Sequence, residues 1–258
     1  MSNLKNSLKD GHKVVGPFMK LANPELVEIF GKAGFDFVII DTEHGPQSTE
    51  SVENLVRAAE LTGISAVVRV RRNDPSLISR ALDVGAEGIL VPQISSSEDA
   101  LNVVKAAKFA PDGERGVCCY VRAASYSHEN KFEYFQRVNR DNVVAILIEG
   151  EQGIKNLDKI IQVPGIDIIF IGPYDLSQSL GLPGQVDHPL VLEKMQEVVN
   201  KTQKAGLAVG TFVDNLGAAA MWSQLGIQFI AYSVDTGIIY LASRDIVFKI
   251  REKFVGVK

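Results

Sequence analysis

The stretch Gly165–Gly181, "GIDIIFIGPYDLSQSLG", joins an apolar run to an acidic side chain through a Gly-Pro turn. The run Ile166–Ile171 is apolar at nearly every position, which is typical of a strand in a parallel sheet whose two faces are both covered. Asp175 follows directly after the turn. An acid in this position is expected at the carboxyl edge of the sheet, where parallel α/β proteins build their binding sites.

The same order recurs along the chain, because an amphipathic segment repeatedly ends in glycine just before an apolar run. Glycine tolerates the left-handed conformation that closes a helix, so each of these glycines predicts a helix exit that leads into a strand. They are Gly34, Gly63, Gly85, Gly165, Gly206 and Gly226. Matching helix starts are predicted at Asn23-Pro24, Asp74-Pro75 and Ser97.

Two further apolar runs, 13–19 and 142–149, bring the number of predicted strand-helix units to eight. Eight such units in about 250 residues predict a (β/α)8 barrel, the TIM-barrel fold, as a single domain over 1–258 with a last helix at about 235–253. The alternative is a doubly wound open sheet, but no G-x-G-x-x-G follows any strand. The longest irregular passage, Pro111–Ser127, is expected on the active-site side of the barrel.

The composition is that of an ordinary globular protein, with 46% hydrophobic and 22% charged residues. A net charge of -4 and a pI near 5.7, with scattered basic residues, argue against a nucleic-acid partner. No apolar run approaches the roughly 18 residues needed to span a bilayer, and the first residues lack a signal-peptide pattern. We therefore expect no membrane partner and a cytoplasmic location. The neighbouring Cys118 and Cys119 are interpreted as reduced thiols.

Polar side chains gather where the predicted strands end, and in a barrel these ends converge on one mouth. Glu149 and Asp175 are best interpreted as ligands of one divalent cation, because two neighbouring carboxylates repel unless a cation compensates for their charge. Oxygen donors favour Mg²⁺ or Mn²⁺. The alternative is that each acid is a solvated loop residue or a helix cap. The full set at the mouth is Asp41, Glu43, His44, Arg69, Gln93, Glu149, Asp175 and Phe212 to Asp214.

Arg69 ends an apolar strand, where a cation is costly unless it meets an anion. That anion is either a substrate or a mouth acid such as Glu43 or Glu149, and both readings stay open. His44 is the one histidine at a predicted strand end, and a general base is its natural role if a carboxylate orients the ring. No lysine is predicted at the carboxyl end of a middle strand, which argues against a Schiff-base mechanism.

Several linked motifs resemble the HpcH/HpaI class II pyruvate aldolases, within the wider group that includes citrate lyase β-type enzymes. They are "DTEHG", "VVRV", "LDVGAEGILVPQ", "PDGERGV", "IEG" and the segment 156–181, and the resemblance covers about residues 10–245. It implies a metal-dependent aldolase that reversibly cleaves a 4-hydroxy-2-oxo acid into pyruvate, or a close 2-oxo acid, and an aldehyde. Mg²⁺ or Mn²⁺ is the implied cofactor, with Co²⁺ as a further candidate.

The resemblance also assigns roles by position. Glu149 and Asp175 match the metal ligands, His44 the base, and Arg69 the group that stabilises the enolate formed when the C3–C4 bond breaks. The implied assembly is a homo-oligomer, a hexamer built as a trimer of dimers. In it the C-terminal helix is exchanged between subunits or packed at their interface.

Two matched residues lie in other parts of the sequence. Arg122 matches a residue that holds a distal carboxylate of the acceptor, and Asp83 matches an acid that polarises the histidine. Asp83 ends a predicted helix at the rim opposite to His44, so the resemblance requires a neighbouring subunit to bring the two together. Asp41 is the local alternative as the partner of His44.

Two positions depart from the family pattern, and both concern the substrate pocket. Leu147 stands where a glutamine that touches the oxo acid is expected, and Tyr174 replaces a small residue whose backbone N–H meets the substrate carboxylate. Phe212 is assigned to the same pocket. Two alternative functions remain: a related lyase acting on a coenzyme A thioester such as malyl- or citramalyl-CoA, and a non-catalytic barrel that binds an oxo acid.

Overall fold

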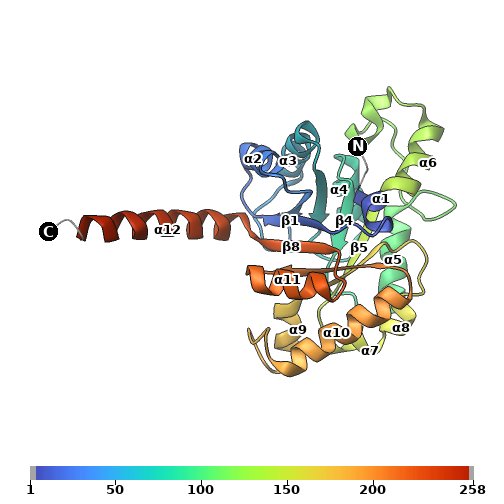
Figure 1. Ribbon diagram of the computed structural model, residues 1–258. Helices are drawn as coiled ribbons and strands as arrows, with labels where there is room; N and C mark the ends of the chain where they lie inside the picture. Colours follow the sequence, from blue (N-terminus) through green and yellow to red (C-terminus); the bar gives the residue numbers. More distant parts are fainter. Residues whose placement is uncertain (1–3, 256–258) are drawn as a thin grey trace.

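The computed structural model describes residues 4–255 and forms a closed barrel of parallel strands in sequence order, with β8 paired to β1 (Figure 1). This confirms the predicted (β/α)8 barrel; residues 1–3 and 256–258 of the predicted domain lie outside the described residues. The strands are β1 (Val14–Met19), β2 (Phe37–Asp41), β3 (Ser65–Arg69), β4 (Gly88–Val91), β5 (Val143–Ile148), β6 (Ile168–Ile171), β7 (Ala208–Val213) and β8 (Phe229–Val234).

Helices follow the strands and surround the barrel. They are α1 (Leu4–Lys9), α2 (Pro24–Ala33), α3 (Thr49–Thr62), α4 (Pro75–Asp83), α5 (Ser97–Ala107), α6 (Lys131–Asp141), α7 (Glu151–Lys155), α8 (Leu157–Ile160), α9 (Pro173–Ser179), α10 (Pro189–Lys204), α11 (Leu216–Gln224) and α12 (Asp235–Val255), with a 3-10 helix η1 (Arg122–Ser127). Asn23 and Asp74 cap α2 and α4 as predicted, and Gly34 ends α2 in the left-handed conformation.

Two apolar layers hold these elements together. The larger one lies between the strands and the helices, and the smaller one fills the barrel, where Phe37 stacks on Phe229 at 4.0 Å between ring centroids. α1 closes the amino end of the barrel with Leu4 and Leu8, and Lys5 pairs with Asp167 there at 2.9 Å. α1 therefore closes the barrel interior at the amino end, opposite to the carboxyl end where barrels of this kind build their active sites.

The passage Pro111–Ser127 lies at the amino end of the barrel, so its expected placement on the active-site side is wrong. The reason is its position in the chain: it follows α5 rather than β4 and therefore begins at the end of a helix. Arg122 in η1 donates hydrogen bonds to Glu60, near the end of α3, and to the carbonyl of Val84, just after α4. Glu60 lies a few residues before β3 and Val84 a few residues before β4, so both partners are at the amino end of the barrel.

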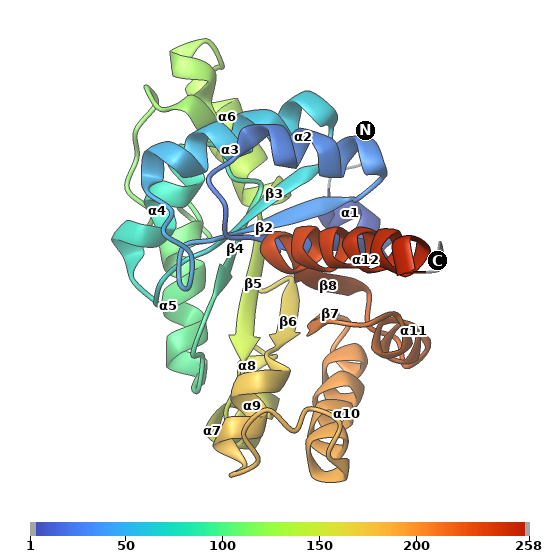
Figure 2. The ribbon, with the colours of Figure 1, turned by 90° about the vertical axis from the view of Figure 1, so that its left-hand side faces the viewer.

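α12 departs from the barrel, as Figures 1 and 2 show, instead of packing on it along its length. Its helical character confirms the predicted last helix. Its exposed apolar side chains are Ile239, Tyr240, Leu241, Ile246, Val247, Phe248, Ile250 and Phe254. Neither α12 nor any other helix within residues 4–255 combines the length and hydropathy needed to cross a membrane.

Candidate active site

A cavity of about 440 Å³ opens at the carboxyl ends of the strands. Figure 2 shows the molecule from this end of the barrel, with α12 in the foreground. The polar lining of the cavity comes from six different strand ends, as the sequence predicts for a barrel mouth. The polar lining residues are Lys20, His44, Arg69, Glu149, Tyr174, Asp175 and Asp214, and the apolar ones include Phe18, Leu147, Phe170 and Phe212.

Glu149 and Asp175 line this cavity from neighbouring strands. Glu149 follows β5, and its Oε1 accepts a hydrogen bond from the backbone N–H of Gln93 at 2.8 Å. Gln93 has φ of 61°, a left-handed conformation that is uncommon for a side chain of this type and that aims its N–H at the carboxylate. Asp175 lies in the first turn of α9, which Gly172 precedes. A Cβ on Gly172 would stand 3.0 Å from Cβ and 3.2 Å from Oε2 of Glu149, so a side chain at this position would crowd the carboxylate.

The electrostatics of these two acids fit a cation. Burial first, and then the negative charge of Asp175, raise the pKa of Glu149 to about 7. Burial and the charge of Asp175 both disfavour the ionised form of Glu149, whereas a bound divalent cation would favour it. Within residues 4–255 no group of three or more His, Cys, Asp or Glu side chains is arranged to hold a metal ion. Two protein carboxylates would therefore leave the remaining coordination positions to substrate and water, as is common for Mg²⁺.

Arg69 is already paired within the protein, as one of its two sequence readings expected. Its Nε and Nη2 donate to the two carboxylate oxygens of Asp41 at 2.9 and 2.7 Å, and Nη1 lies 3.2 Å from Glu43. Burial alone would raise the pKa of Asp41, but the hydrogen bonds and charge of Arg69 outweigh it and hold that pKa below its ordinary value. The guanidinium also lies over the ring of Phe18, 4.7 Å from its centroid. These contacts fix Arg69 in one orientation at the cavity wall.

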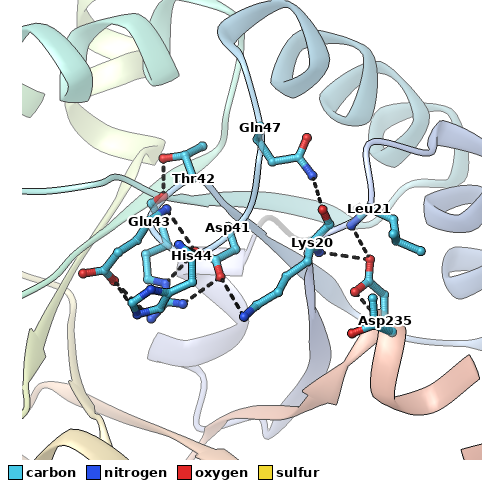
Figure 3. A network of polar contacts seen from close by, with 10 residues as sticks. Lys20, Leu21, Asp41, Thr42, Glu43, His44, Gln47 and Asp235 are labelled. Carbon is cyan, nitrogen blue, oxygen red and sulfur yellow. Dashed lines mark hydrogen bonds and ion pairs between the residues drawn. The ribbon is translucent and has the colours of Figure 1, made fainter. Parts of the chain in front are cut away.

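His44 lies at the same mouth with a side chain that is 58% exposed. Its Nε2 stands 3.9 Å from the carboxylate of Glu43. Asp41 instead accepts hydrogen bonds from the backbone N–H groups of Glu43 and His44 (Figure 3). Asp41 therefore holds the turn and Arg69, and Glu43 is the acid nearest to the ring. The sequence-based choice of Asp41 as the local partner of the histidine ring is not supported by these contacts.

The wall formed by β5, β6 and β7 carries the departures from the family pattern. The phenol of Tyr174 donates a hydrogen bond to Asp214 at 2.5 Å, and this bond, with burial and the charge of Asp214, raises the pKa of Tyr174 to about 12. The Tyr174 ring packs edge-on to Phe212 at 5.9 Å between centroids. Leu147 is 2% exposed and adds an apolar surface inside the barrel. Tyr174, Leu147 and Phe212 thus all border the cavity, as expected.

Arg122 and Asp83 do not join this mouth within one chain. Arg122 is bound to Glu60 and lines a separate cavity of about 980 Å³ toward the amino end. Asp83 is the last residue of α4 and pairs with the buried Arg115 at 2.6 Å. The predicted position of Asp83 at the rim opposite to His44 is confirmed.

The cavity also has lining residues that were not predicted from the sequence, among them Phe18 and Lys20 at the end of β1. A signal for Lys20 was present, since it directly follows the apolar run that defines β1 and therefore stands at a strand end. Lys20 is also a lysine at a carboxyl strand end, although not at a middle strand.

A closed (β/α)8 barrel whose carboxyl mouth gathers acids, a histidine and an arginine around one cavity belongs to the class of barrel enzymes. The family model described as HpcH/HpaI aldolase/citrate lyase matches residues 15–242. The chain belongs to this family.

Similar proteins agree with this assignment over their whole lengths. A 4-hydroxy-2-oxo-heptane-1,7-dioate aldolase of Shigella sonnei is 32% identical, with 100% of this chain and 98% of the relative covered. A hydroxypyruvate/pyruvate aldolase of Paraburkholderia phytofirmans is 33% identical, with 96% and 97% covered. The crystal structure of an HpcH/HpaI aldolase from Desulfitobacterium hafniense superposes with a TM-score of 0.92 at 33% identity and covers 98% of each chain. These relatives support an enzyme of the aldolase type, a carbon–carbon lyase.

Proposed function

We propose that this protein is a divalent-metal-dependent aldolase that reversibly cleaves a 4-hydroxy-2-oxo acid to pyruvate, or a close 2-oxo acid, and an aldehyde. The observation that carries the proposal is the pairing of Glu149 with Asp175 at a cavity that Arg69 and His44 also line. Aldolases named in the comparisons add support, since one acts on a 4-hydroxy-2-oxo diacid and another on hydroxypyruvate or pyruvate.

Glu149 and Asp175 would hold the cation, preferably Mg²⁺ or Mn²⁺, with Co²⁺ as a further candidate. When bound, the cation would bind oxygens of the oxo acid and compensate for negative charge that develops on the ketone oxygen. Arg69, fixed by Asp41 and Glu43, would donate a hydrogen bond to the same oxygen as the C3–C4 bond breaks. His44 would remove the C4 hydroxyl proton in cleavage and return it in condensation. Its exposure would allow the proton to pass to solvent.

The direct test is a screen for pyruvate release from several 4-hydroxy-2-oxo acids with Mg²⁺, Mn²⁺ and Co²⁺ in turn. We expect turnover with at least one acid, and loss of activity in excess chelator that the cation restores. Thioesters of coenzyme A serve as the comparison substrates for the related lyase activity. Full activity in excess chelator would contradict the metal assignment. Failure to exchange the methyl protons of pyruvate with solvent deuterium would contradict enolate formation.

The assembly is a second part of the proposal. α12 makes its main barrel contacts with β1 and β8, and its exposed apolar side chains include Val247, Phe248 and Ile250. A helix with this much exposed apolar surface is expected to pack against another surface. We assign a second copy of this chain as that partner, in a homo-oligomer for which the resemblance implies a hexamer. A neighbouring copy would also be the source of Asp83 and Arg122 at the mouth.

Phe248→Glu tests this assembly. Burial of one Phe side chain contributes about 1.5–3 kcal/mol to association, and in a symmetric pair of helices the substitution removes this contribution from both subunits. We expect the variant to shift to smaller species in size-exclusion chromatography with light scattering. Lys249→Glu, the matched control on the polar side of the same turn, should keep the mass of the parent protein. An unchanged mass for Phe248→Glu would argue against α12 as the contact between subunits.

The cytoplasmic location stays a prediction, which cell fractionation tests.

A further inference from the structure

Lys20 is held at the mouth by contacts to its backbone rather than to its side chain. Its N–H and that of Leu21 both donate to Oδ2 of Asp235, at 3.0 and 2.8 Å, and its carbonyl accepts a hydrogen bond from Gln47 at 3.0 Å. Asp235 and Gln47 are both buried. Figure 3 shows these anchors on one side and the Lys20 side chain extending toward Asp41. The backbone of Lys20 is thus fixed, and its side chain lines the cavity.

The ammonium group of Lys20 donates no hydrogen bond within residues 4–255. Its nearest anion is Oδ2 of Asp41 at 4.0 Å, which is an ion-pair distance but too long for a hydrogen bond. The carboxylate of Asp41 is already filled by two donors of Arg69 and two backbone N–H groups. The Lys20 side chain is 34% exposed, so its three donors are available to a ligand.

Lys20 differs in this respect from Arg69, which Asp41 and Glu43 engage. His44, the third basic side chain that lines the cavity, resembles Lys20, since its nearest acid, Glu43, lies at 3.9 Å, but the proposed mechanism uses its ring as the base. The wall formed by β5, β6 and β7 carries three carboxylates, Glu149, Asp175 and Asp214. These three carboxylates would repel a second anionic group of the substrate, other than the one that a bound cation would hold. The ammonium group of Lys20, at the end of β1, would be available to bind it.

The order of the strands determines where Lys20 lies relative to Glu149. β1 stands four positions from β5 in the closed barrel, so Lys20 faces Glu149 across the mouth. A substrate whose oxo-acid end lies at Glu149 and Asp175 would extend its other end toward Lys20. We propose that Lys20 is a specificity-determining residue that binds a carboxylate on the acceptor-aldehyde portion of the substrate. This inference rests on the proposed function, and it assigns to Lys20 the carboxylate that the resemblance implies for Arg122, whose guanidinium is held by Glu60.

Binding measurements test the inference without turnover. Calorimetric titration compares 2-oxoheptanedioate with 2-oxoheptanoate, which differ only in the distal carboxylate, and repeats the comparison with the five- and six-carbon pairs. We expect the parent protein, loaded with Mn²⁺, to prefer the diacid by about 10- to 100-fold at the best length, the range for a hydrogen bond to a charged group. Lys20→Met should remove this preference, and Lys20→Arg should keep most of it. Lys155→Met, an exposed lysine on α7, controls for net charge.

The outcomes separate this inference from the proposed function. No preference for the diacid at any length, binding of neither ligand, or a preference that survives in Lys20→Met would overturn the role of Lys20. An equal loss of both ligands in Lys20→Met would also overturn it, because it would indicate a disturbed Asp41–Arg69 pair instead. Exchange of pyruvate methyl protons with deuterium involves no acceptor, and it is measured on the parent protein, with Lys155→Met as the variant that should leave it unchanged. If the parent protein shows the diacid preference but no such exchange, the carboxylate site stands and the aldolase function fails.

Discussion

Replacement of Glu149 by Gln, or of Asp175 by Asn, is expected to abolish cation-dependent cleavage while the barrel stays folded. Each change removes a negative charge and one of only two carboxylates at the proposed cation site. Loss of a group that merely supports a metal ligand costs about 10–100-fold, so loss of a ligand itself should cost more than about 100-fold in kcat/KM. The measurement is pyruvate release with saturating Mg²⁺ or Mn²⁺. Glu151→Gln is the matched control, because this acid lies on the exposed side of α7, and it should keep the parent activity.

The pH dependence of the stability of the cation-free protein provides an independent test of the same site. The pKa of Glu149 is raised to about 7 in the folded chain, mainly by burial and then by Asp175. The folded state therefore holds a proton that the unfolded state releases from about pH 4.5 upward, and stability falls as the pH rises through about 7. Glu149→Gln should remove this slope and be more stable than the parent protein at pH 8, by at most about 3 kcal/mol.

Denaturation curves at pH 5 and pH 8, with and without the cation, check this expectation. Addition of Mn²⁺ at pH 8 should raise the melting temperature of the parent protein and not that of Glu149→Gln, because only the folded parent binds the ion. Equal stabilisation of both proteins would mean that the ion binds elsewhere. An active Glu149→Gln enzyme would remove the basis of the proposed mechanism.

The barrel could be predicted because its signals are local and repeated. A glycine such as Gly34 closes a helix in the left-handed conformation, and the apolar strand that follows is marked by its composition alone. Once eight such units are counted, closure of the sheet brings the strand ends together without further information. That is why Glu149, Asp175 and His44 could be assigned to one cavity from the sequence.

The contacts inside the site could not be predicted in the same way. Whether Arg69 meets Asp41, Glu43 or a substrate depends on side-chain conformations within a few ångströms, and residue spacing does not determine these. The left-handed conformation of Gln93, which directs its N–H to Glu149, carries no glycine signal. Such strained positions tend to occur at functional sites and escape propensity arguments.

The wrong placement of Pro111–Ser127 has a different cause. The length of the passage suggested a functional loop, but the side of a barrel on which a loop lies depends on whether it follows a strand or a helix. Here it follows α5, so it runs at the amino end and carries Arg122 to Glu60. Loop length was therefore a weaker guide than chain order.

Arg69→Ala is expected to lower kcat by about 10²–10³-fold, the usual cost of removing a donor aimed at a developing oxyanion. It should also destabilise the fold, by about 3–5 kcal/mol, because it leaves the fully buried Asp41 without its bidentate partner. Arg69→Lys keeps the positive charge but loses the two parallel hydrogen bonds, so its stability should lie between those of Arg69→Ala and the parent protein. Cleavage rates at saturating substrate and urea denaturation measure the two effects separately.

The combination Asp41→Asn with Arg69→Met separates catalysis from folding. It removes the buried charge together with its partner, and replacing both members of a buried pair is often close to neutral for stability. The double variant should therefore unfold more like the parent protein than Arg69→Ala does, and yet remain as slow as Arg69→Ala. If it regained activity along with stability, Arg69 would be a structural partner of Asp41 rather than a group that acts on the substrate. A loss confined to KM would likewise indicate a role in binding the ground state, because a donor used only in the transition state lowers kcat and kcat/KM together.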